Sequence, residues 1–159
     1  MGNGALQGLL SKQNKQWRIR FKFVLTKIVE TQNTPFFKMT LSSNTMHGYR
    51  QPLFATIKGA TKVYTRTYKN GDSSAIPFPR FDFVLNAVTQ LNVRQKIEKD
   101  GKYWLRLYIN GKHIGGAVNR EPLTFKNLAV FLGRNCFCED DGSLESVGRL
   151  WDFEYIEDL

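Results

Sequence analysis

The sequence is poor in the residues that build metal sites and disulfide frameworks. Its 159 residues include two cysteines and two histidines, and His47 and His113 lie far apart, whereas zinc sites usually take four ligands at close spacings. Cys136 and Cys138 are two positions apart. A bridge between them would be strained, because alternate residues of a strand point to opposite faces. We therefore predict no zinc site and two free thiols, with a bond to another chain as the alternative.

Signals that would assign the chain to a membrane or to a common reaction class are also absent. No apolar run approaches the roughly 18–20 residues that span a bilayer. The first ten residues, MGNGALQGLL, lack the basic and apolar parts of a signal peptide, although a processed chain with an added Met would look the same. There is no Gly-x-Ser-x-Gly nucleophile motif, no phosphate-binding Gly-x-x-x-x-Gly-Lys loop and no Asn-x-Ser/Thr glycosylation signal.

Acidic residues are scarce except near the C-terminus. The formal net charge is +9, and eight of the 14 Asp and Glu lie in residues 139–159, where Arg149 is the only basic residue. Two interpretations remain open. The basic body binds a polyanion, such as nucleic acid, a sulfated glycan or an anionic lipid surface, or the acidic segment pairs with part of that body.

Alternation of apolar and polar residues runs through almost the whole chain. In WRIRFKFVL, residues 17–25, apolar side chains alternate with Arg18, Arg20 and Lys22, a period typical of a half-buried strand. Further strands are predicted at residues 36–41, at two runs within 52–71, and at 81–85, 91–98, 103–118, 127–133 and 149–157, with a proline-containing loop at 73–80. This pattern predicts an all-β sandwich or barrel, one domain over residues 1–159, with 1–12 as a candidate flexible segment.

The first long strand and the last are predicted to pair. In residues 149–157 aromatic side chains alternate with Asp152 and Glu154. If the two strands run antiparallel in one sheet, these carboxylates face the basic residues of 17–25 and the aromatic side chains face the core. The predicted core residues of this strand are Trp151, Phe153 and Tyr155.

The clearest turn signal is Asn110-Gly111, within YWLRLYINGKHIGGAV, residues 103–118. A type I′ turn needs positive φ at both central positions, which Asn-Gly tolerates. The turn would place Ile109 opposite Lys112, and Leu107 opposite Ile114 on a mostly apolar face. The other face would carry Trp104, Arg106, Tyr108 and His113, opposite Gly115 and Ala117.

Residues 91–133 resemble the strand–turn–strand core of concanavalin A-like sandwiches of the laminin-G and lectin type. The resemblance rests on residues 101–103 (Gly-Lys-Tyr), 110–112 (Asn-Gly-Lys), Pro122 and 125–128 (Phe-Lys-Asn-Leu). These segments are similar to laminin-G-like extracellular modules of cnidarians and other invertebrates, and residues 47–54, HGYRQPLF, are similar to an upstream element of those modules. The resemblance implies a jelly-roll sandwich of two antiparallel sheets and an extracellular role in recognising a glycan or a protein. It implies no reaction.

Catalysis on such a sandwich would need two carboxylates. Glycosidases place them about 5–9.5 Å apart, and Asp152 and Glu154 would lie about 6.5–7 Å apart on one strand face. However, the order Asp-x-Glu-x-x-Glu, which ends at Glu157, differs from the Glu-x-Asp-x-x-Glu of concanavalin-like glucanases. Pairing with Arg18 and Arg20 would also deny these carboxyls the raised pKa of a general acid. We therefore predict a protein that is not an enzyme.

Two stripes of aromatic and arginine residues remain as candidate ligand-binding sites. They are Trp104, Arg106, Tyr108 and His113 on the predicted hairpin, and Tyr64, Arg66 and Tyr68 on an earlier strand. Aromatic rings pack against the apolar face of a sugar, and arginine donates to hydroxyl or carboxylate oxygens. Either stripe could instead pack beneath a loop or form an oligomer contact. Burying an unpaired arginine would cost folding free energy, however, so we expect the arginines of both stripes to be exposed to solvent.

No cofactor is predicted. Asp72 and the acidic residues of 139–141 offer oxygen ligands suited to Ca²⁺, but a solvated acidic loop is the simpler interpretation. We predict a secreted, extracellular recognition domain that binds a glycan or glycoprotein, with a sulfated polysaccharide favoured by the charge. The alternatives are a structural, self-assembling extracellular protein that forms homo-oligomers through its faces, and a single-stranded nucleic-acid binder, against which the lack of an RNA-binding motif counts.

Overall fold

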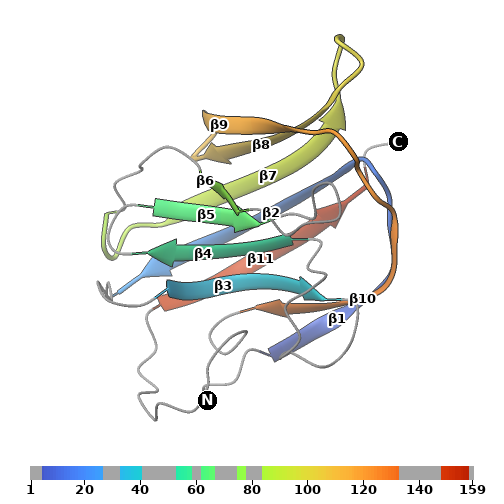
Figure 1. Ribbon diagram of the computed structural model, residues 1–159. Coiled ribbons are helices and arrows are strands. Elements are labelled where there is room, and N and C mark those ends of the chain that lie inside the picture. The colour runs from blue at the N-terminus through green and yellow to red at the C-terminus, as the bar shows by residue number, and fades with distance from the viewer. Residues whose placement is uncertain are drawn as a thin grey trace.

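Two antiparallel sheets face each other in the protein (Figure 1). The computed structural model describes residues 5–26, 33–40, 53–58, 62–66, 75–77, 84–132 and 148–157. The six-stranded sheet has the order β1 (Ala5–Gln13), β10 (Phe125–Leu132), β3 (Asn33–Thr40), β4 (Leu53–Lys58), β5 (Lys62–Arg66), β6 (Ala75–Pro77). The five-stranded sheet has the order β11 (Gly148–Ile156), β2 (Trp17–Leu25), β7 (Thr89–Ile97), β8 (Tyr103–Ile109), β9 (Lys112–Asn119). The predicted all-β sandwich of two antiparallel sheets is confirmed.

The core lies between the two sheets. In β2 every second residue from Trp17 to Leu25 is buried, and the same alternation recurs in β7 and β8. Leu128 of β10, in the other sheet, belongs to the same buried cluster. Burying each large apolar side chain stabilises the fold by roughly 1.5–3 kcal/mol. The alternation therefore fixes which face of the five-stranded sheet points to solvent.

Three segments differ from the sequence prediction. Ala5–Gln13, most of which fell in the candidate flexible segment 1–12, is strand β1 and pairs with β10. Within the predicted loop 73–80, Ala75–Pro77 pairs with β5 as a short edge strand, a place where proline is tolerated. Within the predicted strand 81–85, Val84 and Leu85 lie outside any strand, because the chain turns at Asn86, which has a φ of 60°. No helix that could cross a membrane occurs among the described residues.

The predicted hairpin turn is present between β8 and β9. Asn110 has a φ of 49° and Gly111 a φ of 78°, as a type I′ turn requires. Ile109 pairs with Lys112, as predicted. The side-chain oxygen of Asn110 also accepts a hydrogen bond of 2.8 Å from the Gln90 backbone N–H, so the turn is fixed to the start of β7.

A β-bulge shifts the hairpin register beyond the first pairs. Leu107 pairs with Gly115 rather than with Ile114, so the predicted pairing of Leu107 with Ile114 is wrong. A bulge inserts one extra residue in one strand and displaces every later pair by one position. Arg106 consequently faces Gly116. The extra residue lies in β9, so the alternation along β8 is unaffected.

β2 and β11 pair antiparallel, as predicted. Arg20 donates two hydrogen bonds to Glu154, of 2.8 and 2.7 Å, and Lys22 Nζ lies 2.7 Å from Asp152 Oδ2. Part of the acidic C-terminal segment therefore neutralises part of the basic body, which supports the second interpretation of the charge asymmetry for these four residues.

A second β-bulge interrupts β11 between Trp151 and Glu154. Asp152 has a φ of 52°, the left-handed conformation that opens many bulges. Leu150 and Phe153 pack against the core, whereas Trp151 stands opposite Lys22 on the solvent side. The prediction that Trp151 faces the core is therefore wrong, because strict alternation fails at the bulge.

Candidate functional site

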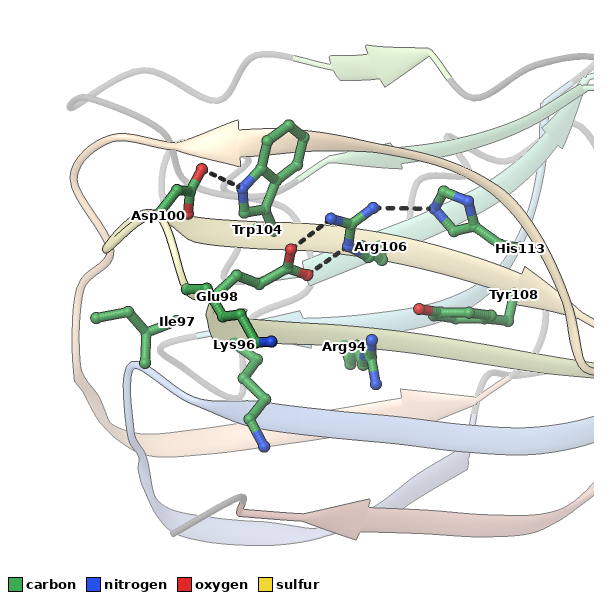
Figure 2. A pocket seen from close by; sticks show the side chains of 10 residues that line it. Arg94, Lys96, Ile97, Glu98, Asp100, Trp104, Arg106, Tyr108 and His113 are labelled. Atoms are coloured by element: carbon green, nitrogen blue, oxygen red, sulfur yellow. Dashed lines mark hydrogen bonds and ion pairs between the residues drawn. The ribbon is translucent and has the colours of Figure 1, made fainter.

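An open hollow of about 840 Å³ lies on the outer face of β7, β8 and β9. Its walls are outward-facing side chains of these strands and of the turn that joins β7 to β8 (Figure 2). All four residues of the predicted hairpin stripe line it: Trp104, Arg106, Tyr108 and His113. Because β7, β8 and β9 follow one another in both sequence and space, one continuous segment of chain builds the hollow.

Arg106 is held in the centre of the hollow by Glu98. Its Nε and Nη2 donate to the two carboxylate oxygens of Glu98, both at 2.5 Å, in a bidentate pair. The hydrogen bonds from Arg106 hold the pKa of the Glu98 carboxyl below its usual range. The side chains of Arg106 and Glu98 keep 23% and 29% of their surface exposed, so the pair remains within reach of a ligand.

Trp104 forms one wall of the hollow and is half-buried. Its indole Nε1–H donates a 3.1 Å hydrogen bond to Asp100 Oδ2, and the Arg106 guanidinium lies 4.8 Å from its ring centroid. The hydrogen bond from Trp104, together with one from the Lys102 backbone N–H, lowers the pKa of Asp100. The ring orientation is thus fixed before any ligand arrives, while one region of the ring is already occupied by Arg106.

The turn between β7 and β8 places both carboxylates. The Glu98 N–H donates to the Lys102 carbonyl at 3.0 Å, and the Gly101 N–H donates to the Glu98 carbonyl at 2.9 Å. Gly101 has a φ of 72°, which favours glycine. Asp100 Oδ1 accepts from the Lys102 N–H at 3.1 Å. This closed turn brings Glu98 and Asp100 to the side chains of β8 that they orient.

Tyr108, His113 and Arg94 form the other end of the hollow. The Tyr108 and His113 rings pack in a tilted arrangement with centroids 5.2 Å apart, and the Arg94 guanidinium lies 5.0 Å from the Tyr108 ring centroid. Arg106 Nη1 lies 3.5 Å from His113 Nε2. The hollow therefore presents rings and guanidinium groups in alternation, with donors that point across it (Figure 2).

The second predicted stripe belongs to the other sheet. Tyr64 and Arg66 lie on β5, and Tyr68 lies outside the described residues. The two stripes therefore lie on different sheets. The role predicted for this second stripe stays a prediction.

Six residues that line the hollow were not predicted from the sequence: Arg94, Lys96, Ile97, Glu98, Lys99 and Asp100. Arg94 and Lys96 alternate with buried residues along β7, a signal that was present in residues 91–98. The partnership of Glu98 with Arg106 had no comparable signal, because it depends on how the β7–β8 turn closes.

Neighbouring side chains hold three of the carboxylates near the C-terminus. Asp152 and Glu154 are each held by a cation at 2.7 Å. Glu157 accepts hydrogen bonds from Asn14 Nδ2 at 2.5 Å and from the Tyr155 hydroxyl at 3.3 Å. Each of these three carboxylates is therefore already engaged by a neighbouring side chain.

No group of three His, Cys, Asp or Glu side chains converges as a metal site in the part of the chain that the structure describes. The candidate Ca²⁺ ligands, Asp72 and residues 139–141, lie outside that part, as do Cys136 and Cys138. The predictions for calcium and for the two thiols therefore stay predictions.

Comparisons with known proteins identify the fold. No protein-family model matches the sequence, and no curated protein matches it. Among solved structures, sheep galectin-11 in complex with glycerol superposes with a TM-score of 0.60 at 16% identity, covering 98% of this chain and 99% of that one. A structure of botulinum neurotoxin type C, whose cell entry is described as dependent on interaction with two ganglioside molecules, superposes with a TM-score of 0.59 at 16% identity, over 91% of this chain and 33% of the toxin chain.

An enzyme also shares the fold. The endo-β-1,4-glucuronan lyase of the fungus Trichoderma reesei superposes with a TM-score of 0.55 at 11% identity, covering 92% of this chain and 68% of that one. At such identities the likeness shows the fold alone, a galectin-like jelly roll of the concanavalin A-like type. The expected likeness to invertebrate extracellular modules stays a prediction.

Proposed function

We propose that this protein is an extracellular, non-enzymatic recognition domain that binds a glycan in the hollow on the outer face of its five-stranded sheet. The observation that carries the proposal is the preorganised row of Trp104, Arg106 and Tyr108, three alternate residues of β8 that line one open surface. An aromatic ring packs on the apolar face of a sugar, and fixed guanidinium and imidazole groups donate hydrogen bonds to its hydroxyl groups.

Preorganisation favours a binding role for these residues. Ordering a long side chain on association costs about 0.5–1.5 kcal/mol. Here Glu98 already holds Arg106, and Asp100 already holds Trp104. The bidentate pair uses Arg106 Nε and one hydrogen of Nη2, which leaves the Nη1 hydrogens on the side of His113. A ligand hydroxyl could accept from these hydrogens without breaking the pair.

The fold is compatible with this role. The toxin that shares the fold is described as interacting with two ganglioside molecules, and the lyase is named for its action on glucuronan. The lyase shows that the fold also supports catalysis, but the ion-paired carboxylates of β11 favour binding without reaction in this chain.

A glycan array tests the proposal with a matched pair of variants. Trp104→Ala removes the aromatic wall of the hollow and should weaken binding to the glycans that the unmodified protein selects by about tenfold or more. Truncating an aromatic side chain that anchors a ligand commonly costs about 2 kcal/mol or more of binding free energy. Trp151→Ala is the control, because Trp151 is a half-buried tryptophan on the outer side of the same sheet that does not line the hollow.

The result that contradicts the proposal is equal binding by Trp104→Ala and the unmodified protein, with both variants folded by circular dichroism. A blank array together with a homo-oligomer on size-exclusion chromatography would favour the self-assembling alternative. The array is run with and without Ca²⁺, which also tests the calcium prediction.

A further inference from the structure

The outer face of the five-stranded sheet carries an excess of positive charge that is not spread evenly. On β2, β7 and β8 six cations point outward: Arg18, Arg20, Lys22, Arg94, Lys96 and Arg106. Three of them hold a carboxylate, namely Arg20, Lys22 and Arg106. In the part of the chain that the structure describes, the other three make no ion pair. We call Arg18, Arg94 and Lys96 the basic strip.

The basic strip is continuous across two strands. Arg18 of β2 and Arg94 of β7 are direct cross-strand partners, and Arg94 is also the partner of Arg106 on β8. Directly opposed side chains in antiparallel strands have Cβ atoms about 4.5–5.5 Å apart, and like charges at this distance are destabilising. On the far side of Arg18, β11 places Ile156 opposite it instead of a carboxylate. The prediction that Arg18 pairs with the C-terminal carboxylates is therefore wrong.

The two arginines have unused donors at their bases. Arg18 Nε and Arg94 Nε are both buried and have no hydrogen-bond partner among the described residues. Each of the two residues as a whole is half-buried. Arg94 is steadied by the Tyr108 ring, 5.0 Å from its guanidinium carbon, and lines the hollow together with Lys96.

The negative charge nearest to the strip is already committed. Glu98 contacts Arg106 with both oxygens and influences Arg94 only through space. Asp100 accepts from Trp104 on the far side of Arg106, and in Figure 2 Lys96 extends away from Trp104. Among the described residues, Arg94 therefore lies beside three further cations, Arg18, Lys96 and Arg106, and the Glu98 carboxylate that acts on it is already paired with Arg106. An added anion would relieve this repulsion.

We infer that the basic strip is an anion subsite for an acidic saccharide, one whose sulfate or carboxylate group lies between Arg18 and Arg94 while a sugar ring occupies the hollow. Two guanidinium forks on neighbouring strands suit a sulfate, which offers three free oxygens, or a carboxylate, which offers two. This inference rests on the proposed function, because the subsite adjoins the hollow through Arg94 and Lys96. Beyond the proposed function, it specifies that the saccharide carries an anionic group.

The test is a calorimetric titration of a heparin-derived hexasaccharide into the full chain. Its fully desulfated counterpart, which keeps the carboxylates, and a neutral hexasaccharide distinguish the sources of the anionic group. The unmodified protein should bind the sulfated probe at least about tenfold more tightly than the neutral one, with an affinity that falls steeply as salt rises. Similar affinity for the sulfated and neutral probes would overturn the inference.

Matched variants locate the anion on the protein. Arg18→Gln combined with Arg94→Gln should lower affinity for the sulfated probe about tenfold or more and reduce the slope of log affinity against log salt by roughly two. Arg20→Gln removes one charge from the same face, but from a cation that Glu154 already neutralises, so it should change affinity less than about twofold. The affinity for the sulfated probe is also measured for three single variants, Arg18→Gln, Arg94→Gln and Arg20→Gln. Equal losses of affinity in all three would show that binding responds only to net charge, which would overturn the inference.

A conservative pair keeps the inference testable if the Gln pair unfolds. Arg18→Lys with Arg94→Lys retains both charges but loses the planar fork, and it should weaken binding of the sulfated probe several-fold. Unchanged binding would contradict the proposed contact between the two guanidinium forks and the anion. Single-stranded DNA with the same charge as the sulfated probe serves as a further comparison. If the protein binds this DNA more tightly than the sulfated probe, and the same variants lose that binding, the inference is overturned in favour of a nucleic-acid ligand.

The two proposals fail differently. If neutral glycans bind in a Trp104-dependent way but sulfate adds nothing, the proposed function stands and the anion subsite is wrong. If no saccharide binds at all, both are wrong.

Discussion

At the scale of single residues, the site depends on carboxylates that orient its cation and its largest ring. Glu98 fixes Arg106, and Asp100 fixes Trp104. The sequence predicted that Trp104 and Arg106 share an exposed face, because strand alternation determines the direction of each side chain. It could not predict their partners, because Glu98 and Asp100 reach them only through the closed turn between β7 and β8.

These contacts predict a dependence on pH. The pKa values of Glu98 and Asp100 are both lowered in the folded protein, by the hydrogen bonds from Arg106 and from Trp104 respectively. A lowered pKa gives stability that is fully present above the ordinary carboxyl range, about pH 4, and that is lost as pH falls through the lowered values. The indole N–H resonance of Trp104 should therefore stay constant from neutral pH down to the ordinary carboxyl range, about pH 4, and shift only below it.

A variant isolates the contribution of the ion pair. Glu98→Gln keeps the size of the side chain but removes its titrating group, so the difference in stability between the unmodified protein and the variant should shrink as the pH falls below about 4. A stability difference between the two proteins that stays constant from about pH 3 to about pH 7 would contradict the role assigned to Glu98.

At the scale of elements, two bulges set the details that alternation alone could not give. The sequence predicted the β8–β9 hairpin from Asn110-Gly111, and the structure has the turn. It did not predict the extra residue in β9, because a bulge leaves no apolar–polar signature in so short a strand. In β11 the bulge after Trp151 turned that residue outward, against the prediction.

The β11 bulge predicts a specific ranking of variants at Asp152. Asp152→Gly and Asp152→Val both remove the carboxylate that contacts Lys22, but glycine adopts a φ of 52° freely and valine does not. Valine should therefore lower the free energy of unfolding by about 1–3 kcal/mol more than glycine. Urea unfolding followed by circular dichroism measures the difference, and equal midpoints for the two variants would contradict the bulge geometry.

At the scale of the whole molecule, pairing of β2 with the C-terminal strand β11 decides which positive charge stays free. The sequence predicted that β2 and β11 pair and that their charges oppose each other, and Arg20 and Lys22 do hold carboxylates. It could not predict the rest of the strand order, such as the position of β7 between β2 and β8, because hydrophobic alternation does not specify which distant strand is a neighbour. That order places Arg94 between Arg18 and Arg106, which creates the basic strip.

The account as a whole depends on one face of one sheet being the binding surface, and mapping the ligand by nuclear magnetic resonance tests this most directly. Backbone amide shifts of the ¹⁵N-labelled protein are recorded during titration with the tightest-binding saccharide. The account predicts that the largest changes fall in β7, β8 and β9 and at the indole N–H of Trp104, with Trp151 unaffected. Changes confined to the six-stranded sheet, including β5, would contradict it.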